Sequence, residues 1–227
     1  MIVCVCPNWQ ALPRPGKEVI VIRTIADFAP QDAETGVGLV IQDDRRRYLF
    51  FLAGPRHYCP PGDLFYAGIG GHREAGEDWL ACAHREAIEE VGSDVAILPS
   101  DVTWYVDRHG RSEQVEISDQ PRPFALCEMI HPPGTPRAGM LYRIVIYKAR
   151  LDEDPNDLAQ DEVLGVLALT EAQVVRGIKD RPTVSDVLDG GASLVAGDDR
   201  VDRRLRLYPL GTAAALGQIL RRSAAKP

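Results

Sequence analysis

The sequence predicts an α+β protein in which a mixed β-sheet lies between helices. Strand-like apolar runs recur along most of the chain, and they are bounded by Gly, Pro and Asp. Among them stands one segment of helical character, Leu80–Val91, whose apolar residues repeat at spacings of three and four. A helix with an apolar stripe packs that stripe against a neighbouring layer, which here is the predicted sheet.

The strand-like runs follow one another in chain order with short polar connections. The expected strands are 36–42, 48–52, 64–69, 94–98, 102–106, 124–130, 140–151 and 163–169. The first two form a hairpin around the polar turn Asp43–Arg47, because the apolar pattern stops there and resumes after it. The run 140–151 is the most strand-like in the protein, since its apolar residues alternate.

Helical signals return toward the end of the chain. Thr170 and Gln173 have the spacing of a capping box, which predicts a helix over 171–177. Further helices are expected at 183–188 and 212–222, and the basic run 200–207 is a candidate strand.

The length of 227 residues is compatible with one domain that carries extensions at both ends. We expect a single domain over 1–227 with its core at about 36–177. Residues 1–35 form an N-terminal strand extension, with strand-like runs at 1–5 and 18–22, and residues 178–227 form a C-terminal helical extension. The first of these strands is a candidate for an edge strand or a homodimer contact.

Composition excludes several classes of partner. A net charge of −7 argues against binding to a nucleic-acid polymer, which requires a basic surface. No apolar run approaches the length of a membrane span, and no signal peptide is evident. The five cysteines show no zinc-ligand spacing. The expected partner is therefore a small molecule, with no membrane, and the expected compartment is the cytoplasm.

The predicted helix carries three acids on one side. Glu86, Glu89 and Glu90 fall within an arc of about 100°, away from the apolar stripe formed by Leu80, Ala83, Ala87, Ile88 and Val91. Trp79 and Cys82 project into the acidic sector, which indicates that this side does not face open water. Grouped carboxylates attract a hard cation, Mg²⁺ or, as a substitute, Mn²⁺. A solvated acidic face is the alternative interpretation.

A longer motif surrounds these acids. Gly71, five residues, Glu77, seven residues and then Arg85-Glu86-Ala87-Ile88-Glu89-Glu90-Val91-Gly92 match the Nudix box of the Nudix hydrolases at every fixed position. On this resemblance the chain is identified as a member of that family. Ser93 and Ile69 stand where the family usually has an aliphatic residue and often a proline, and neither departure affects a metal ligand.

The resemblance implies an α/β/α sandwich around the mixed sheet, and it implies roles for individual residues. The Gly71 carbonyl and the carboxylates of Glu86, Glu89 and Glu90 are expected to bind metal, and Glu162, an acid before a late strand, is a further candidate. Glu77 is expected to orient Arg85, which helps to place the glutamates. Catalytic roles thus fall on Glu77, Arg85, Glu89 and Glu90, and the general base stays open among Glu89, Glu90 and Glu162.

By this resemblance the protein is a Mg²⁺-dependent hydrolase that cleaves a phosphoanhydride bond in a nucleoside diphosphate joined to another group. The alternative is a Nudix-fold module that binds a nucleotide or regulates without hydrolysis. Two long loops, Asp107–Pro123 and His131–Gly139, are expected to border the substrate pocket. Arg108 and Arg111 are the substrate-binding candidates in the first loop, and His131 and Arg137 are those to test in the second.

Overall fold

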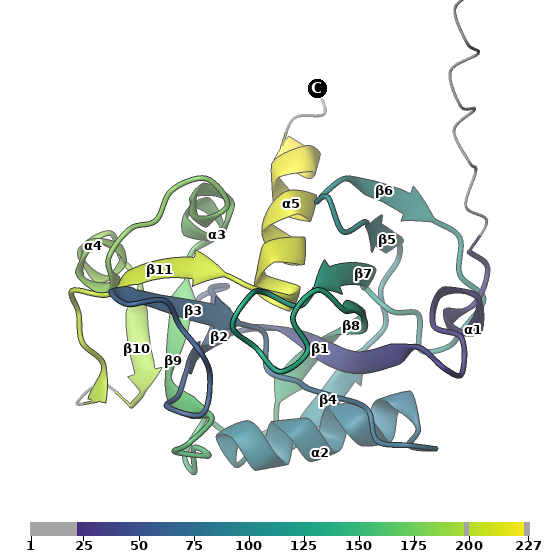
Figure 1. Cartoon of the computed structure of the whole chain (residues 1–227), viewed down its shortest axis with the longest axis horizontal. Helices are drawn as coiled ribbons and strands as arrows, with labels where there is room; N and C mark the ends of the chain where they lie inside the picture. The colour runs from purple at the N-terminus through teal and green to yellow at the C-terminus, as the bar shows by residue number, and fades with distance from the viewer. Residues whose placement is uncertain (1–21, 198–199, 225–227) are drawn as a thin grey trace, which may run out of the picture.

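A computed structural model describes residues 22–197 and 200–224, and it has one mixed β-sheet flanked by helices (Figure 1). The strand expected at 1–5, and that expected at 18–22 as far as residue 21, lie outside the described residues. No helix in the described part of the chain is both long enough and apolar enough to span a bilayer.

The elements follow the predicted order closely. The strands are β1 (Glu34–Gln42), β2 (Tyr48–Ala53), β3 (Asp63–Ala67), β4 (Val95–Leu98), β5 (Thr103–Val106), β6 (Ser112–Val115), β7 (Ala125–Ile130), β8 (Leu141–Leu151), β9 (Val163–Leu169), β10 (Ser193–Ala196) and β11 (Arg206–Pro209). The helices are α1 (Ile25–Phe28), α2 (Trp79–Val91), α3 (Glu171–Gly177), α4 (Val184–Asp189) and α5 (Thr212–Ala224).

The sheet mixes parallel and antiparallel pairs. Its main path runs β10-β9-β2-β1-β8-β7-β5-β6, while β3 joins β2 to β11 and β4 pairs with β8. The pairs β1–β8, β5–β7 and β3–β11 are parallel, and the others are antiparallel. The predicted hairpin of β1 and β2 is present, with Ile41 opposite Leu49.

Helices cover both faces of this sheet (Figure 1). The helix α2 contacts β1 and β4 on one face, and α5 contacts β1, β3, β5, β6 and β7 on the other, with α3 against α5. Strand β2 is buried along its whole length, which explains its unbroken apolar sequence YLFFLA. The result is the α/β/α arrangement that the sequence predicted.

Two expectations need correction. Asp107–Pro123 is not one long loop, because Ser112–Val115 forms β6 and pairs antiparallel with β5. The C-terminal extension is not only helical either, since β10 pairs with β9 and β11 pairs with β3. The strands that were not expected, β6 and β10, are short and of mixed polarity, so the alternation of their apolar residues is too brief to be recognised. Strand β11 overlaps the candidate strand at 200–207.

Candidate active site

The acidic helix begins and ends where its local sequence directs. The side chain of Asp78 accepts hydrogen bonds from the backbone N–H groups of Leu80 and Ala81, which caps the first turn of α2. Gly92 follows the last turn in the left-handed conformation, with φ of 68°. These two residues fix the span of the helix and therefore the register of its glutamates.

The orientation of α2 differs from the prediction. Glu86 and Glu90, at 8% and 4% exposure, lie on the buried side together with Cys82, whereas Ile88 is 53% exposed. The expected packing of Ile88 in the apolar stripe is therefore wrong, because Glu86 and Glu90 are buried while Ile88 is exposed. Cys82 is buried as its position in the acidic sector indicated. Among the three helix acids, Glu89 is the one that reaches solvent, with its side chain 57% exposed.

The turn Gly70–Gly71 makes room for the two buried carboxylates. A Cβ on Gly71 would lie 2.5 Å from Oε2 of Glu86, so a side chain at this position would displace that carboxylate. The backbone N–H of Gly70 donates to Oε2 of Glu90 at 2.9 Å, and the φ of Gly70 is 135°. Because the Gly70–Gly71 turn carries no side chains, Glu86 and Glu90 can be buried against it, whereas Ile88 is exposed.

Burial changes the acidity of this pair. It raises the pKa of Glu86, although the neighbouring Arg85 guanidinium opposes the effect. Burial raises the pKa of Glu90 well above the ordinary value, and the hydrogen bond from Gly70 only partly offsets this. The negative charges of the neighbouring glutamates raise the pKa of both groups further. The positive charge near Glu86 and Glu90 is therefore too small to offset their burial and their mutual repulsion.

Arg85 and Glu77 form the predicted contact. Nε of Arg85 donates to Oε1 of Glu77 at 2.8 Å, and Nη2 donates to Oε2 at 3.1 Å. The hydrogen bond from Arg85 lowers the pKa of Glu77 to about 2. The same guanidinium reaches Glu86 at 2.8 Å and Glu89 at 2.9 Å, and it also donates to the carbonyl of His72. Arg85 therefore links the helix acids to the turn in front of them.

Glu162 joins the helix acids from a distant part of the chain. The negative charge of Glu162 contributes to the raised pKa of Glu86 and of Glu90. The loop before it is held to α2 by a hydrogen bond from the Ala159 N–H to the Glu90 carbonyl, 3.3 Å long. Its side chain forms an ion pair with Arg56, a residue that the sequence did not single out.

The carbonyl of Gly71, a predicted metal ligand, already accepts two hydrogen bonds. The Val37 N–H donates to it at 2.9 Å and the Tyr142 hydroxyl at 3.0 Å. Tyr142 was predicted only as a strand residue. Its alternation in β8 showed that it points to one face, but no local signal showed that this face meets the glycine turn.

The two candidate loops lie at different places. His131 and Arg137 contact Glu34, at the start of β1, and the ring of His131 stacks on His72, the residue after Gly71. Arg108 instead lines a cavity of about 230 Å³ between the β5–β6 turn, β7 and α5. Arg111 pairs with Asp107 at 2.6 Å in the same turn. No contact between these two arginines and the acids of α2 is found in the described residues.

The predicted donor set consists of oxygen ligands. It comprises the carboxylates of Glu86, Glu89, Glu90 and Glu162, with Arg85 and Arg56 as the paired cations. Oxygen donors of this kind suit Mg²⁺ and Mn²⁺ rather than softer metals. All four are candidates from the sequence: Glu86, Glu89 and Glu90 lie on one side of the predicted helix, and Glu162 follows from the family resemblance.

A comparison with protein families agrees with this site. A model of the NUDIX domain matches residues 33–186, more than half of the 227-residue chain. The chain therefore belongs to the Nudix family, and it is a Nudix hydrolase. Pyrophosphohydrolase activity on small nucleotide-derived substrates, with divalent metals, is typical of this family. A search of curated protein sequences gave no match.

Solved structures of Nudix proteins resemble the chain at low sequence identity. A NUDIX hydrolase from Nitrosomonas europaea is 17% identical, with 63% of this chain and 75% of that chain covered and a TM-score of 0.42. The MutT protein of Methanosarcina mazei Go1 is 10% identical, with 86% and 96% covered and a TM-score of 0.48. A C. elegans Ap4A hydrolase in a binary complex is 17% identical, with 63% and 85% covered and a TM-score of 0.39. At these values none of them bears on the substrate of this chain.

Proposed function

We propose that this chain is a Mg²⁺-dependent pyrophosphohydrolase that cleaves a nucleoside diphosphate joined to another group. The observation that carries the proposal is the grouping of Glu86 and Glu89 on Arg85, with Glu90 bonded to the adjacent Gly70–Gly71 turn. Carboxylates that are buried together and raise one another's pKa cost stability unless a cation joins them. A structural role alone gives no reason to keep such a group.

The residues fit a hard divalent cation. Glu86 and Glu90 are held against the glycine turn, and Glu89 extends toward solvent, where a polyphosphate would approach. Glu162 is the fourth proposed ligand, and the loop before it is bonded to the end of α2. The Gly71 carbonyl remains a proposed ligand, and it would have to exchange the Tyr142 hydroxyl for the cation. When bound, Mg²⁺ supplies the positive charge that offsets the pyrophosphate and makes a water acidic enough to attack near neutral pH.

The surrounding side chains have positioning roles in this proposal. Arg85, held by Glu77, orients Glu86 and Glu89 through its Nη1 group. Removing Glu77 therefore disturbs two carboxylates without removing either. Glu89, Glu90 and Glu162 stay the candidates for the proton acceptor, and Glu89 is the most open of the three to an incoming water.

Arg108 stays a proposed substrate-binding residue, and the cavity that it lines is beside α5, on the other face of the sheet from α2. Arg108 lines this cavity together with Asp107, Glu128 and Gln218, so it combines a cation with hydrogen-bonding groups. Such a mixture suits a group attached to the diphosphate. Arg111 is the weaker substrate-binding candidate, because Asp107 already pairs with it.

The test is release of phosphate-containing products from a panel of substrates by the purified chain with Mg²⁺. The panel comprises ADP-ribose, nucleotide sugars, coenzyme A, dinucleoside polyphosphates and damaged nucleoside triphosphates. We expect hydrolysis of at least one class, and we expect EDTA to abolish it. Binding of a panel member without hydrolysis, under conditions in which Mg²⁺ raises the melting temperature, would instead support the nucleotide-binding module.

A further inference from the structure

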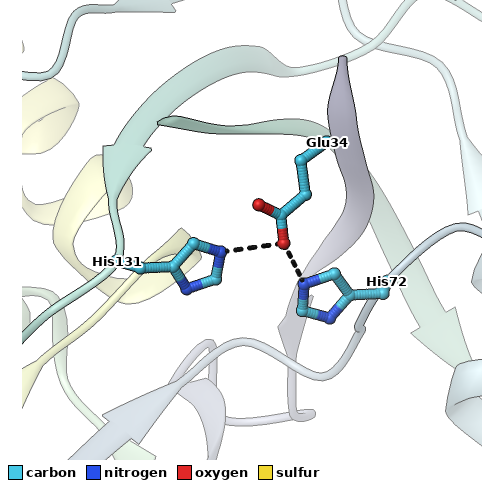
Figure 2. Close-up of side chains that lie close together, drawn as sticks. All are labelled: Glu34, His72 and His131. Carbon is cyan, nitrogen blue, oxygen red and sulfur yellow. Dashed lines mark hydrogen bonds and ion pairs between the residues drawn. The ribbon is translucent and has the colours of Figure 1, made fainter. Parts of the chain in front are cut away.

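A second group of metal-ligating side chains lies next to the acidic site. Glu34 stands at the start of β1, His72 follows Gly71, and His131 follows β7. Nε2 of His72 lies 3.0 Å from Oε1 of Glu34, and Nε2 of His131 lies 3.1 Å from the same oxygen. Figure 2 shows both imidazole rings directing a nitrogen toward this carboxylate. Three segments that are distant in sequence thus place their ligand atoms within 4.8 Å of one another.

The hydrogen bonding of Glu34 is unbalanced. Oε1 contacts both histidines and also forms an ion pair with Arg137, so three groups meet at one oxygen. Oε2 is buried and has no hydrogen-bond partner among the described residues. A carboxylate that served only as a hydrogen-bond acceptor would distribute these contacts over its two oxygens. Oε1 is therefore the oxygen that both imidazoles share, and Oε2 is left without a partner in the part of the chain that the structure describes.

The rings are held in place by packing. His72 and His131 stack with an interplanar angle of 4°, and Tyr142 contacts them at centroid distances of 4.6 and 5.1 Å. The hydroxyl of Tyr142 is fixed by its hydrogen bond to Gly71. The two imidazoles are therefore oriented before any ligand arrives, which lowers the ordering cost of binding.

The ligand chemistry differs from that of the acidic site. Two imidazole nitrogens and one carboxylate are a set typical of Zn²⁺, and with three protein ligands the fourth position stays open. Bond lengths of 2.0–2.2 Å place neighbouring donor atoms about 3.3 Å apart around a tetrahedral ion. The separations of 3.0 and 3.1 Å are close to this spacing. Mg²⁺ requires octahedral oxygen ligands and does not suit this set.

We propose that Glu34, His72 and His131 form a second metal site, which takes Zn²⁺ or a related borderline cation such as Co²⁺. The ion would connect the start of β1, the residue after the glycine turn and the β7–β8 loop. Because the His72 carbonyl accepts a hydrogen bond from Arg85 at 3.0 Å, binding would also hold the turn that faces the helix acids. Arg137 competes with the ion for Glu34, since it occupies the same oxygen.

The test uses the full chain, stripped with EDTA and then supplied with excess Mg²⁺ so that the acidic site is saturated. Co²⁺ is titrated while its visible absorption is followed, and Zn²⁺ is titrated by calorimetry. We expect one equivalent of Zn²⁺ or Co²⁺ to bind, with the absorption of a tetrahedral ion. His72→Gln and His131→Gln should each weaken binding at least about 10-fold. His109→Gln, which changes an exposed histidine outside the cluster, should leave binding unchanged.

Two further variants separate this site from its neighbour. Glu86→Gln should retain the Zn²⁺ equivalent, and Arg137→Ala should tighten its binding because a competing cation is removed. The side chain of His72 is 47% exposed, so His72→Gln provides a test that folds even if the buried His131 does not tolerate substitution. The proposal is overturned if wild-type protein takes up no Zn²⁺ or Co²⁺. It is also overturned if Glu86→Gln abolishes uptake while His72→Gln leaves it intact.

Discussion

The acidic site and the Glu34 cluster lie on either side of the Gly71–His72 peptide, yet they are built from different donors. The acidic site gathers four carboxylates, two of them buried, with two guanidinium groups. The Glu34 cluster gathers one carboxylate, two imidazoles and one guanidinium. Tyr142 joins them, since its hydroxyl contacts Gly71 while its ring contacts both histidines.

The difference shows how adjacent sites can select different cations. An all-oxygen group of high negative charge suits a hard ion that is needed to neutralise a polyphosphate. A nitrogen-rich group of low net charge suits a borderline ion that is held by geometry. The four predictions that follow perturb the acidic site and the cavity beside α5, from the largest expected effect to the smallest.

The largest effect is expected for Glu86→Gln and Glu90→Gln. Each removes one negative charge while it keeps the shape of the side chain, so we expect kcat to fall by about 100-fold or more. The Mg²⁺-induced rise in melting temperature should shrink, while the melting temperature without metal should stay level or rise because a buried charge is lost. Steady-state kinetics and thermal shift with and without Mg²⁺ measure both. Glu113→Gln, on exposed β6, is the matched control. Full activity in both site variants would exclude the helix from catalysis.

A smaller loss is expected for Glu77→Gln. This change weakens the two hydrogen bonds that orient Arg85, so Glu86 and Glu89 lose their common anchor. Activity should fall by about 10- to 100-fold, as is usual when a residue behind a metal ligand is changed. The readout that separates positioning from general damage is the Mg²⁺ concentration for half-maximal activity, which should increase. An unchanged Mg²⁺ requirement with reduced kcat would contradict this role.

A modest effect is expected for Arg108→Ala. If this arginine contacts the group attached to the diphosphate, KM should rise by about tenfold while kcat changes little. Arg111→Ala is the paired control, because Asp107 already holds that side chain at 2.6 Å and a smaller change is expected. Equal kinetics for Arg108→Ala and wild type on the true substrate would remove the α5 cavity from the proposed binding path.

The smallest effect is a pH dependence of stability in the metal-free protein. A glutamate titrates near 4.5 in the unfolded chain, and the pKa of Glu90 is well above this value in the folded protein. Between pH 4.5 and this raised pKa, Glu90 binds more protons in the folded protein than in the unfolded chain. The free energy of unfolding that this group contributes therefore falls as pH rises. Urea unfolding in EDTA from about pH 5 to about pH 8 should show this fall, and Glu90→Gln should flatten it. The same slope in both proteins would assign the effect to other groups.

The sequence by itself determined the features that depend on neighbouring residues. The spacing from Gly71 to Gly92 was sufficient to predict the family and the residues of the box. The turn at Asp43–Arg47 and the capping box of Thr170 and Gln173 also formed as predicted. In the turn and the capping box the hydrogen bonds join residues within a few positions, so the local pattern contains the necessary information.

Only the tertiary structure decided which side of α2 is buried. A hydrophobic pattern assumes that the surface facing a helix is apolar, and it therefore favoured Ile88 over Glu86 and Glu90. The surface facing this helix includes a glycine turn that offers a backbone N–H and free space, so carboxylates are accommodated there. The identity of the facing surface is not encoded in the helix sequence.

The convergence of distant residues was likewise decided by the fold. Glu34, His72 and His131 meet because β1 pairs in parallel with β8 and β8 pairs antiparallel with β7, which brings the start of β1 to the end of β7. Glu162 reaches the helix acids because the loop before β9 is bonded to the end of α2. Strand pairing between remote segments depends on the packing of the whole chain, and neither composition nor local periodicity specifies it.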